Sequence, residues 1–118
     1  MKEWNYKYLA KMVYDNPDEF NGLYRIPWFL SWLRKNMHIF NEFYRYAKKL
    51  KYKGNRDYYS ARAITQRLRW DTLFEENESQ FKISDHSTPY MARLVMLIKP
   101  DLKGMFRIKY ANIPESEE

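Results

Sequence analysis

The segment Tyr90–Ile98, with the sequence YMARLVMLI, constrains the fold of this chain more than any other segment. It is apolar except for one charged residue, Arg93. A membrane span takes about 20 apolar residues, and no apolar run in this sequence approaches that length. A helix that is apolar on every side has to be buried. Thr88 as N-cap and Pro89 at the first helical position favour a helix that begins here. We therefore predict that this helix forms the centre of the core.

The length and composition favour one folded domain. The chain has 118 residues and 19% aromatic residues, and disordered chains lack such aromatic content. We expect a single domain over 1–113, with an N-terminal helix and loop or arm over 1–24, a core over 36–110, and a disordered acidic tail over 114–118. The absence of Cys excludes disulfides and thiolate metal sites. The opening residues contain no secretory apolar stretch, so we expect a cytoplasmic protein.

Apolar residues at helical spacing predict four further helices, over 4–14, 26–35, 37–52 and 60–74. Their ends carry recognisable signals. Pro17 stops the first helix, because the residue before proline avoids the α region. Asn36 is a candidate N-cap of the third helix, Gly54 a candidate C-terminal cap, and Ser60 a candidate N-cap.

Two short strands are also predicted. Residues 81–84 begin with Phe-Lys-Ile, and residues 105–110 alternate between apolar and basic side chains. We expect them to pair antiparallel. The predicted fold is therefore α+β: a mainly helical small domain of four to five helices with a short two-stranded antiparallel sheet, winged-helix-like. A helix, and not a hairpin, separates the two strands, which departs from an ordinary wing.

The positive charge of the chain is concentrated in one segment. Between positions 45 and 69 there are nine Lys and Arg and one acidic residue, Asp57, so that segment carries a net charge of +8. The remaining 12 Lys and Arg and 14 Asp and Glu give −2, within a total of +6. A local excess of this kind is typical of a surface that binds a polyanion. The alternative is a solvated helix face whose lysines favour the helix C-terminus.

The predicted helix after Ser60 has three sides. Ala61, Ile64 and Leu68 would face the core, and Tyr59 and Trp70 would support the packing. A second side carries Arg62, Thr65, Gln66 and Arg69, with side chains of the types that read base edges. Lysines nearby would neutralise phosphates. The candidate binding residues are Arg45, Lys48, Lys49, Lys51, Lys53, Arg56, Arg62, Thr65, Gln66 and Arg69.

The segment 28–33 is the second candidate surface. It contains Trp28, Phe29 and Trp32 with a single Ser among apolar residues. A helix this apolar is either core on more than one side or a contact surface for a partner or a second copy. Aromatic residues dominate the binding energy of protein interfaces. Both alternatives stay open from the sequence.

Enzymatic signals are weak. The three Gly are scattered, so no phosphate-binding glycine loop exists. His38 and His86 lack metal-ligand spacing. Adjacent residues in Asp85-His86-Ser87 cannot face one another as a catalytic triad must. We predict no enzyme, no cofactor and no metal.

A spaced pattern over roughly residues 36–110 resembles a group of small phage and prophage proteins that has no assigned function. The matching positions are Asn36, His38, Gly54, Tyr59, Ser60, Ile64, Arg69, Trp70, Phe81, Lys82, Ile83, Tyr90, Ala92, Arg93, Pro100, Gly104 and Phe106. The chain departs from the pattern at Met37, where Pro is usual, and at Ser84-Asp85, where Asn is usual. The resemblance implies a phage or mobile-element context, and hence the cytoplasm of a bacterial host.

Two functional hypotheses follow. The first is nucleic-acid binding, in a regulatory or another role, through the basic helices of residues 45–69. The second is a phage inhibitor, such as an anti-CRISPR or another anti-defence protein, that binds a host nuclease or its guide-RNA complex. The sequence does not distinguish DNA from RNA, and a homodimer is compatible with it.

Overall fold

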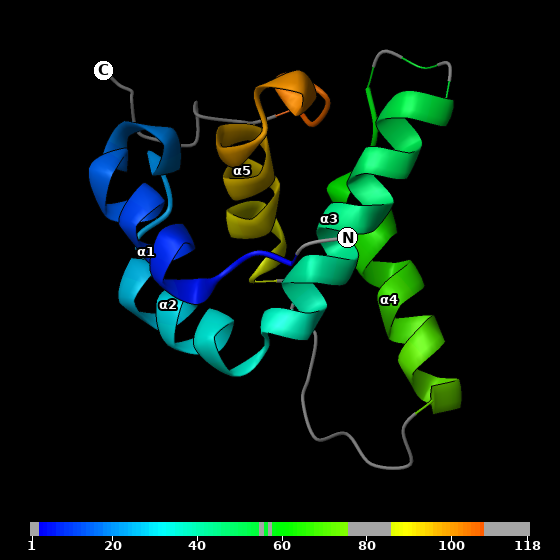
Figure 1. Ribbon diagram of the computed structural model, residues 1–118, viewed down its shortest axis with the longest axis horizontal. Coiled ribbons are helices and arrows are strands. Elements are labelled where there is room, and N and C mark those ends of the chain that lie inside the picture. Colours follow the sequence, from blue (N-terminus) through cyan, green and yellow to red (C-terminus); the bar gives the residue numbers. More distant parts are fainter. Residues whose placement is uncertain (1–2, 55, 57, 76–85, 108–118) are drawn as a thin grey trace.

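The computed structural model describes residues 3–54, 56, 58–75 and 86–107, with the backbone alone over 71–75. The described residues form five α-helices and two short 3₁₀-helices (Figure 1). In chain order these are α1 (Tyr6–Asp15), η1 (Pro17–Phe20), α2 (Ile26–Lys35), α3 (Met37–Lys53), α4 (Ala61–Glu75), α5 (Thr88–Ile98) and η2 (Pro100–Leu102).

Helix α5 is the centre of the core, as its apolar sequence predicts. It runs through the middle of the molecule, with α1 and α2 on one side and α3 and α4 on the other (Figure 1). It contacts α1, α3 and α4 directly. Met91, Leu94 and Val95 are completely buried. Each such side chain stabilises the fold by about 1.5–3 kcal/mol relative to exposure. The helix begins one residue earlier than predicted, because Ser87 and not Thr88 occupies the N-cap position.

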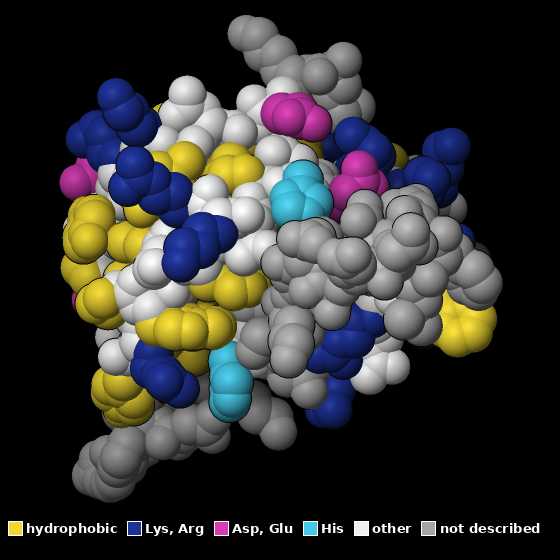
Figure 2. Space-filling view, turned by 90° about the horizontal axis from the view of Figure 1, so that it is seen from below, with side chains coloured by type: hydrophobic (Ala, Val, Ile, Leu, Met, Phe, Trp, Pro, Cys, Tyr) yellow, Lys and Arg dark blue, Asp and Glu magenta, His cyan; other side chains and the backbone are white. Residues whose placement is uncertain are grey.

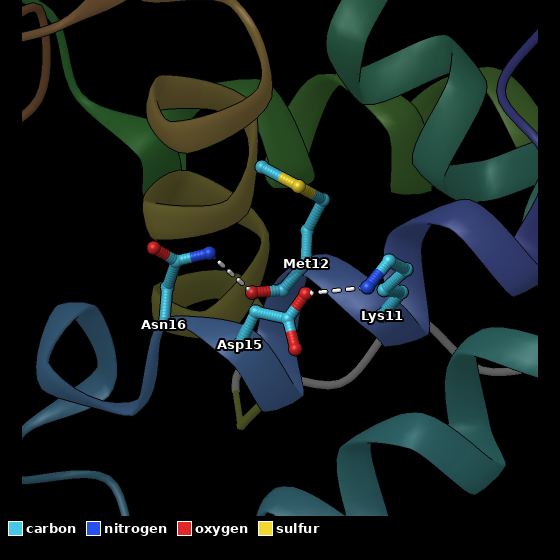
Figure 3. A network of polar contacts seen from close by, with 4 residues as sticks. All are labelled: Lys11, Met12, Asp15 and Asn16. Carbon is cyan, nitrogen blue, oxygen red and sulfur yellow. Dashed lines mark hydrogen bonds and ion pairs between the residues drawn. The ribbon is translucent and has the colours of Figure 1, made fainter.

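Helix α1 ends where the sequence predicts. Asn16 adopts a non-helical conformation before Pro17, and its side-chain Nδ2 donates a hydrogen bond of 2.9 Å to the carbonyl of Met12. An ion pair of 2.8 Å between Lys11 and Asp15 lies beside this contact on the last turns (Figure 3). The amide satisfies one of the carbonyls that a helix end leaves without a backbone partner.

Residues 3–24 fold onto their own chain and do not project as an arm. Leu9 and Val13 of α1 and Phe20 of η1 are buried in the core. The backbone N–H of Trp4 donates a hydrogen bond of 2.8 Å to Oδ1 of Asn41 in α3. These contacts attach the N-terminal segment to both halves of the helical core.

One residue, Asn36, separates α2 from α3. Its side-chain Nδ2 donates to the carbonyl of Trp32 at 2.9 Å, which satisfies the end of α2. Its own carbonyl accepts from the N–H of Ile39 and of Phe40, which begins α3. Asn36 occupies the predicted N-cap position of α3, but its side chain makes no cap hydrogen bond to that helix and caps the preceding one instead.

Gly54 is the C-cap of α3, as predicted, for a reason the sequence does not contain. Its φ of −83° is open to any residue. However, a Cβ at this position would collide with the hydroxyl of Tyr59 and would lie 2.6 Å from the carbonyl oxygen of Leu50. Glycine is required here because the ring of Tyr59 closes against the end of the helix.

The predicted α+β, winged-helix-like fold is wrong for the part of the chain that the structure describes, which is mainly helical and contains no strand or sheet. Phe106 makes an isolated bridge with Tyr59, and the two segments run parallel. The N–H of Tyr59 donates to the carbonyl of Met105 at 2.8 Å. The alternation after Gly104 thus marks a buried Phe106 beside an exposed Arg107, and the partner is the segment before α4. Residues 81–84, 108–110 and the tail 114–118 lie outside the described residues.

None of the described helices combines the length and apolar character that crossing a membrane would require.

Candidate nucleic-acid interface

The C-terminal end of α3 carries a cluster of lysines, here called the lysine end: Lys48, Lys49, Lys51 and Lys53. Lys48 lies 5.4 Å from the ring centre of Tyr44, and Lys49 lies 5.8 Å from that of Tyr46. Lys51 and Lys53 are exposed in the last turn, where the negative end of the helix dipole favours cations. Part of this charge is therefore stabilised by the protein itself.

Arg45, one or two turns earlier on α3, is engaged within its own helix. Its Nη1 lies 2.6 Å from Oε2 of Glu42, and both side chains are close to half exposed. Exposed pairs of this kind contribute little to stability, about 0–1 kcal/mol. A phosphate can replace the carboxylate at small cost, so Arg45 stays a peripheral candidate.

The carboxylate of Asp101 faces the lysine end from η2. It accepts a hydrogen bond of 3.1 Å from the hydroxyl of Tyr52. Partial burial raises the pKa of Tyr44 and of Tyr52, and the negative charge of Asp101 raises both further. This carboxylate lowers the positive potential at the end of α3.

Helix α4 begins as the sequence predicts. Oγ of Ser60 accepts a hydrogen bond of 3.1 Å from the N–H of Ala63, an N-cap contact of about 0.5–2 kcal/mol. Ile64 and Leu68 are buried and Ala61 is half buried, so the predicted core side is correct.

The predicted binding side of α4 is only partly exposed. Arg62 and Gln66 lie at the surface and Arg69 is half buried. Thr65 is completely buried, so it cannot contact a ligand. Its Oγ1 donates to the carbonyl of Arg62 at 2.9 Å and accepts from Oγ1 of Thr88 at 3.3 Å. Helix α4 packs against both α3 and α5. Its buried side is therefore wider than the predicted stripe of Ala61, Ile64 and Leu68.

The two aromatic residues predicted to support this helix differ. Tyr59 is half buried and packs against the core, as predicted. Trp70 is 58% exposed, so its predicted role as a packing support is wrong. Helix α4 extends past its neighbours there (Figure 1).

Arg67, absent from the predicted set, connects the two basic helices. Its guanidinium lies 5.7 Å from the ring centre of Tyr46 on α3. Lys49 approaches the same ring at 5.8 Å. The ring of Tyr46 is therefore in contact with one cation from α3 and one from α4. The sequence of α4 alone does not indicate this meeting of the two helices.

A groove of about 960 Å³ lies where five segments of the chain meet. Its walls come from Gly22–Leu23, Leu50 of α3, the segment 56–63, the start of α5, and Phe106–Arg107. Four arginines line it, Arg56, Arg62, Arg93 and Arg107, and no Asp or Glu is among its described lining residues. We call it the arginine groove. Leu50 lies between the lysines of α3, so the lysine end adjoins the groove.

The arginines of the groove are held in different ways. The guanidinium carbon of Arg107 lies over the ring of Tyr58, 4.1 Å from its centre. Arg93 is only 6% exposed, and its Nη1 donates a hydrogen bond of 2.6 Å to the carbonyl of Asn21. Arg56, before α4, and Arg62, in its first turn, are exposed. The groove thus has a fixed basic floor and exposed basic rims.

Two helices begin at the groove. The first residues of α4 and of α5 are both in its wall. The N-terminus of a helix carries a partial positive charge that favours anions. Both helix dipoles therefore add to the potential of the arginines.

The cations of the protein are not gathered in this way everywhere. On the face seen from below, Lys and Arg side chains are separated by hydrophobic and neutral side chains (Figure 2). Among the predicted binding residues, the structure brings Arg56 and Arg62 together in the groove with the lysine end beside them. Gln66, Arg69 and Arg45 lie on the helices outside its described walls.

The predicted set misses Tyr58, Arg93 and Arg107. The sequence holds one signal for Arg107, which stands on the basic side of an alternating segment. For Arg93 the signal is its position as the one charge in an apolar helix. Neither signal indicates that these residues meet Arg56, because the contact depends on the tertiary fold.

The second candidate surface is core. Phe29 is completely buried and stacks on Tyr90 with ring centres 4.8 Å apart. Trp28 and Trp32 are partly buried and pack against the same core. The prediction of a partner surface at Trp28, Phe29 and Trp32 is therefore wrong for Phe29, and the alternative of a buried helix is correct.

Among the described residues, no three His, Asp or Glu side chains gather as metal ligands. His38 and His86 are exposed.

Comparisons with protein-family models, with curated proteins and with solved structures give no match for this chain.

Proposed function

We propose that this protein binds nucleic acid, as a binding protein and not as an enzyme, through the arginine groove and the adjoining lysine end. The observation that carries the proposal is the groove, because four arginines from three separate segments line one concavity without a described acidic residue. Arginine is suited to phosphate, since its planar donors bind two oxygens at once.

The electrostatics of the neighbourhood support the same proposal. The lysine end supplies exposed point charges beside the groove, and two helix N-termini add to its potential. Phosphate neutralisation provides most of the affinity of proteins for nucleic acid. The segment 45–69 therefore serves as the approach surface, and the groove as its focus.

The alternative of a phage inhibitor that docks on a host nuclease has less support. The aromatic segment proposed as its contact surface packs into the core, with Phe29 completely buried. The basic surface is also compatible with an acidic protein partner. Binding experiments with nucleic acid and with an acidic peptide distinguish the two kinds of partner.

A salt titration tests the proposal. With four to six phosphate contacts, a plot of log affinity for generic duplex against log salt has an expected slope of about −4 to −5. Replacing Lys49, Lys51 and Lys53 by Gln should reduce the magnitude of that slope by about two to three, since each phosphate contact contributes about one. Fluorescence anisotropy with a labelled duplex measures both quantities.

A matched variant controls for net charge. Lys7, Lys11 and Lys35 are also exposed, and none of them lines the groove. Their replacement by Gln removes the same three charges and should leave the slope nearly unchanged. If the two variants lose affinity equally, only net charge matters. If neither duplex nor single strand binds at low salt, the proposal fails.

A further inference from the structure

The arginine groove has walls that phosphate alone does not explain. Apolar side chains surround its arginines, among them Leu23, Leu50, Ala92 and Phe106. The phosphates of a duplex lie on the outside of the helix and would leave such walls without a partner. A nucleic-acid base has an apolar, aromatic face that such walls can cover.

Tyr58 provides a stacking platform at the groove. Its ring is half exposed, and the guanidinium of Arg107 covers it at 4.1 Å. Stacked aromatic and guanidinium planes are the surfaces on which proteins place unpaired bases. The groove also falls within the range of about 300–1,000 Å³ that is typical of small-ligand sites, so one base with its sugar and phosphate is of suitable size.

A second hollow shares part of its lining with the groove. This hollow of about 520 Å³ shares Tyr58 and Phe106 with the groove, and its wall also contains Met96 and Leu97 with one charge of each sign, Glu19 and Lys103. Tyr58 lines both hollows, and its ring is the more exposed of the two shared residues, so a ligand that occupies both has Tyr58 between its parts. That arrangement suits a chain of linked units better than one free nucleotide.

We infer that the arginine groove binds an unpaired nucleotide within a single-stranded nucleic acid, with its base between the apolar walls beside Tyr58 and its phosphate on Arg56, Arg62 and Arg107. The next nucleotide of the strand passes over Tyr58 toward the second hollow. This inference rests on the proposed function and specifies its substrate class.

The inference makes a prediction opposite to that of charge alone. Duplex has the higher charge density and releases more counterions per phosphate than a single strand, about 0.9 against 0.7. A basic surface without a base site therefore binds duplex more tightly. We expect the protein to bind a 12-nucleotide single strand at least about 10-fold more tightly than the 12-base-pair blunt duplex.

Three labelled probes of equal length separate the possible outcomes: the single strand, the duplex, and a single strand with abasic sites. The abasic strand keeps the phosphates but lacks bases, and we expect it to bind about 10-fold or more weakly than the intact strand. Equal affinity for both single strands would overturn the inference and leave the proposed function standing. Absence of binding to all three probes would contradict both the inference and the proposed function.

A pair of tyrosine variants tests the platform itself. Tyr58→Ala should weaken single-strand binding by about 5- to 100-fold, the range measured for loss of one base stack, and change duplex binding less than twofold. Tyr14→Ala is the control, because Tyr14 is also exposed but lies on α1 and lines neither hollow. Equal effects of the two substitutions would contradict the role of Tyr58.

Arg107 offers a second control within the platform. Arg107→Lys keeps the charge that faces the phosphate but lacks the planar guanidinium over Tyr58, so it should recover only part of the single-strand affinity that Arg107→Ala loses. Full retention of affinity by the Lys variant would show that Arg107 acts only through its positive charge.

An acidic peptide, such as a ten-residue polyglutamate, is the competing occupant. If it displaces the single strand at equal concentration, the groove is a peptide site and the inference is wrong.

Discussion

The lysine end and the arginine groove are two basic regions that adjoin each other and differ in construction. The lysines come from one stretch of one helix, point into solvent, and lie partly over tyrosines of α3. The arginines come from segments far apart in the chain and converge on one concavity. Density of charge along the sequence locates the neighbourhood of a site. Convergence in space, which only the fold produces, gives it a shape that a ligand can fill.

The largest expected effect comes from removing three positive charges from each region in turn and comparing the two losses of affinity. Replacing Arg56, Arg62 and Arg107 by Gln should lower single-strand affinity by about 100-fold or more, because charge-assisted hydrogen bonds contribute about 1.5–3 kcal/mol each. Replacing Lys49, Lys51 and Lys53 by Gln should lower it by about 5- to 10-fold. Anisotropy titrations at one salt concentration measure both. Equal losses would mean that the groove has no role beyond its charge.

The second effect concerns Gly54, which ends α3 next to two residues of the groove, Leu50 and Tyr59. Gly54→Ala should destabilise the protein by about 1–3 kcal/mol, as overpacking does, because the new Cβ collides with Tyr59 and the Leu50 carbonyl. Chemical denaturation measures the loss. In a Tyr59→Phe background the same substitution should cost less, since part of the collision is with the hydroxyl. An equal cost in both backgrounds would show that Tyr59 does not close against Gly54.

A smaller effect tests the connection between α3 and α4. Arg67→Ala should weaken binding of both duplex and single strand by about three- to fivefold, since it removes one charge that is worth less than 1 kcal/mol at the surface. Arg34→Ala is a suitable control, because that arginine also lies over a tyrosine, Tyr6, at 5.8 Å but is remote from α4. A loss with Arg34→Ala as large as with Arg67→Ala would argue against a local role.

The smallest effect comes from Asp101. Asp101→Asn should raise affinity about twofold at low salt, because it removes a carboxylate beside the lysine end. It should also lower the pKa of Tyr52, which an NMR titration of its ring carbons follows. An unchanged Tyr52 pKa would separate Asp101 from that hydroxyl.

The same carboxylate predicts a dependence of stability on pH. The pKa of Tyr44 and of Tyr52 is raised in the folded protein, so the unfolded chain loses these protons first as pH rises. Their effect is absent below about pH 10, the ordinary tyrosine pKa, and lowers the free energy of unfolding above it. Denaturation midpoints between pH 9 and 11 should fall less steeply in Asp101→Asn.

The sequence predicts those features of the fold that depend on neighbours in the chain. The end of α1 at Asn16, the boundary at Asn36 and the cap at Ser60 are confirmed because each rests on contacts within four residues. The apolar segment of α5 gives the centre of the core for a similar reason. Local chemistry suffices for these elements.

Features that depend on distant contacts were not predicted. The alternation after Gly104 has the form of a strand, yet Phe106 makes its bridge with Tyr59, in the segment before α4. Thr65 is buried because α5 covers a side of α4 that its own sequence leaves polar. The candidate site is half predicted: Arg56 and Arg62 were in the set, whereas Tyr58, Arg93 and Arg107 join them only through the fold.

The bridge between Tyr59 and Phe106 has a consequence for synthesis on the ribosome. The segment that begins α4 emerges long before Phe106 and Arg107, and the wall that these two residues supply does not exist until then. The lysine end, in contrast, needs only α3. A nascent chain therefore presents a basic helix early and a shaped groove last, so discrimination between ligands begins only when residue 107 has left the exit tunnel and the closing contacts have formed.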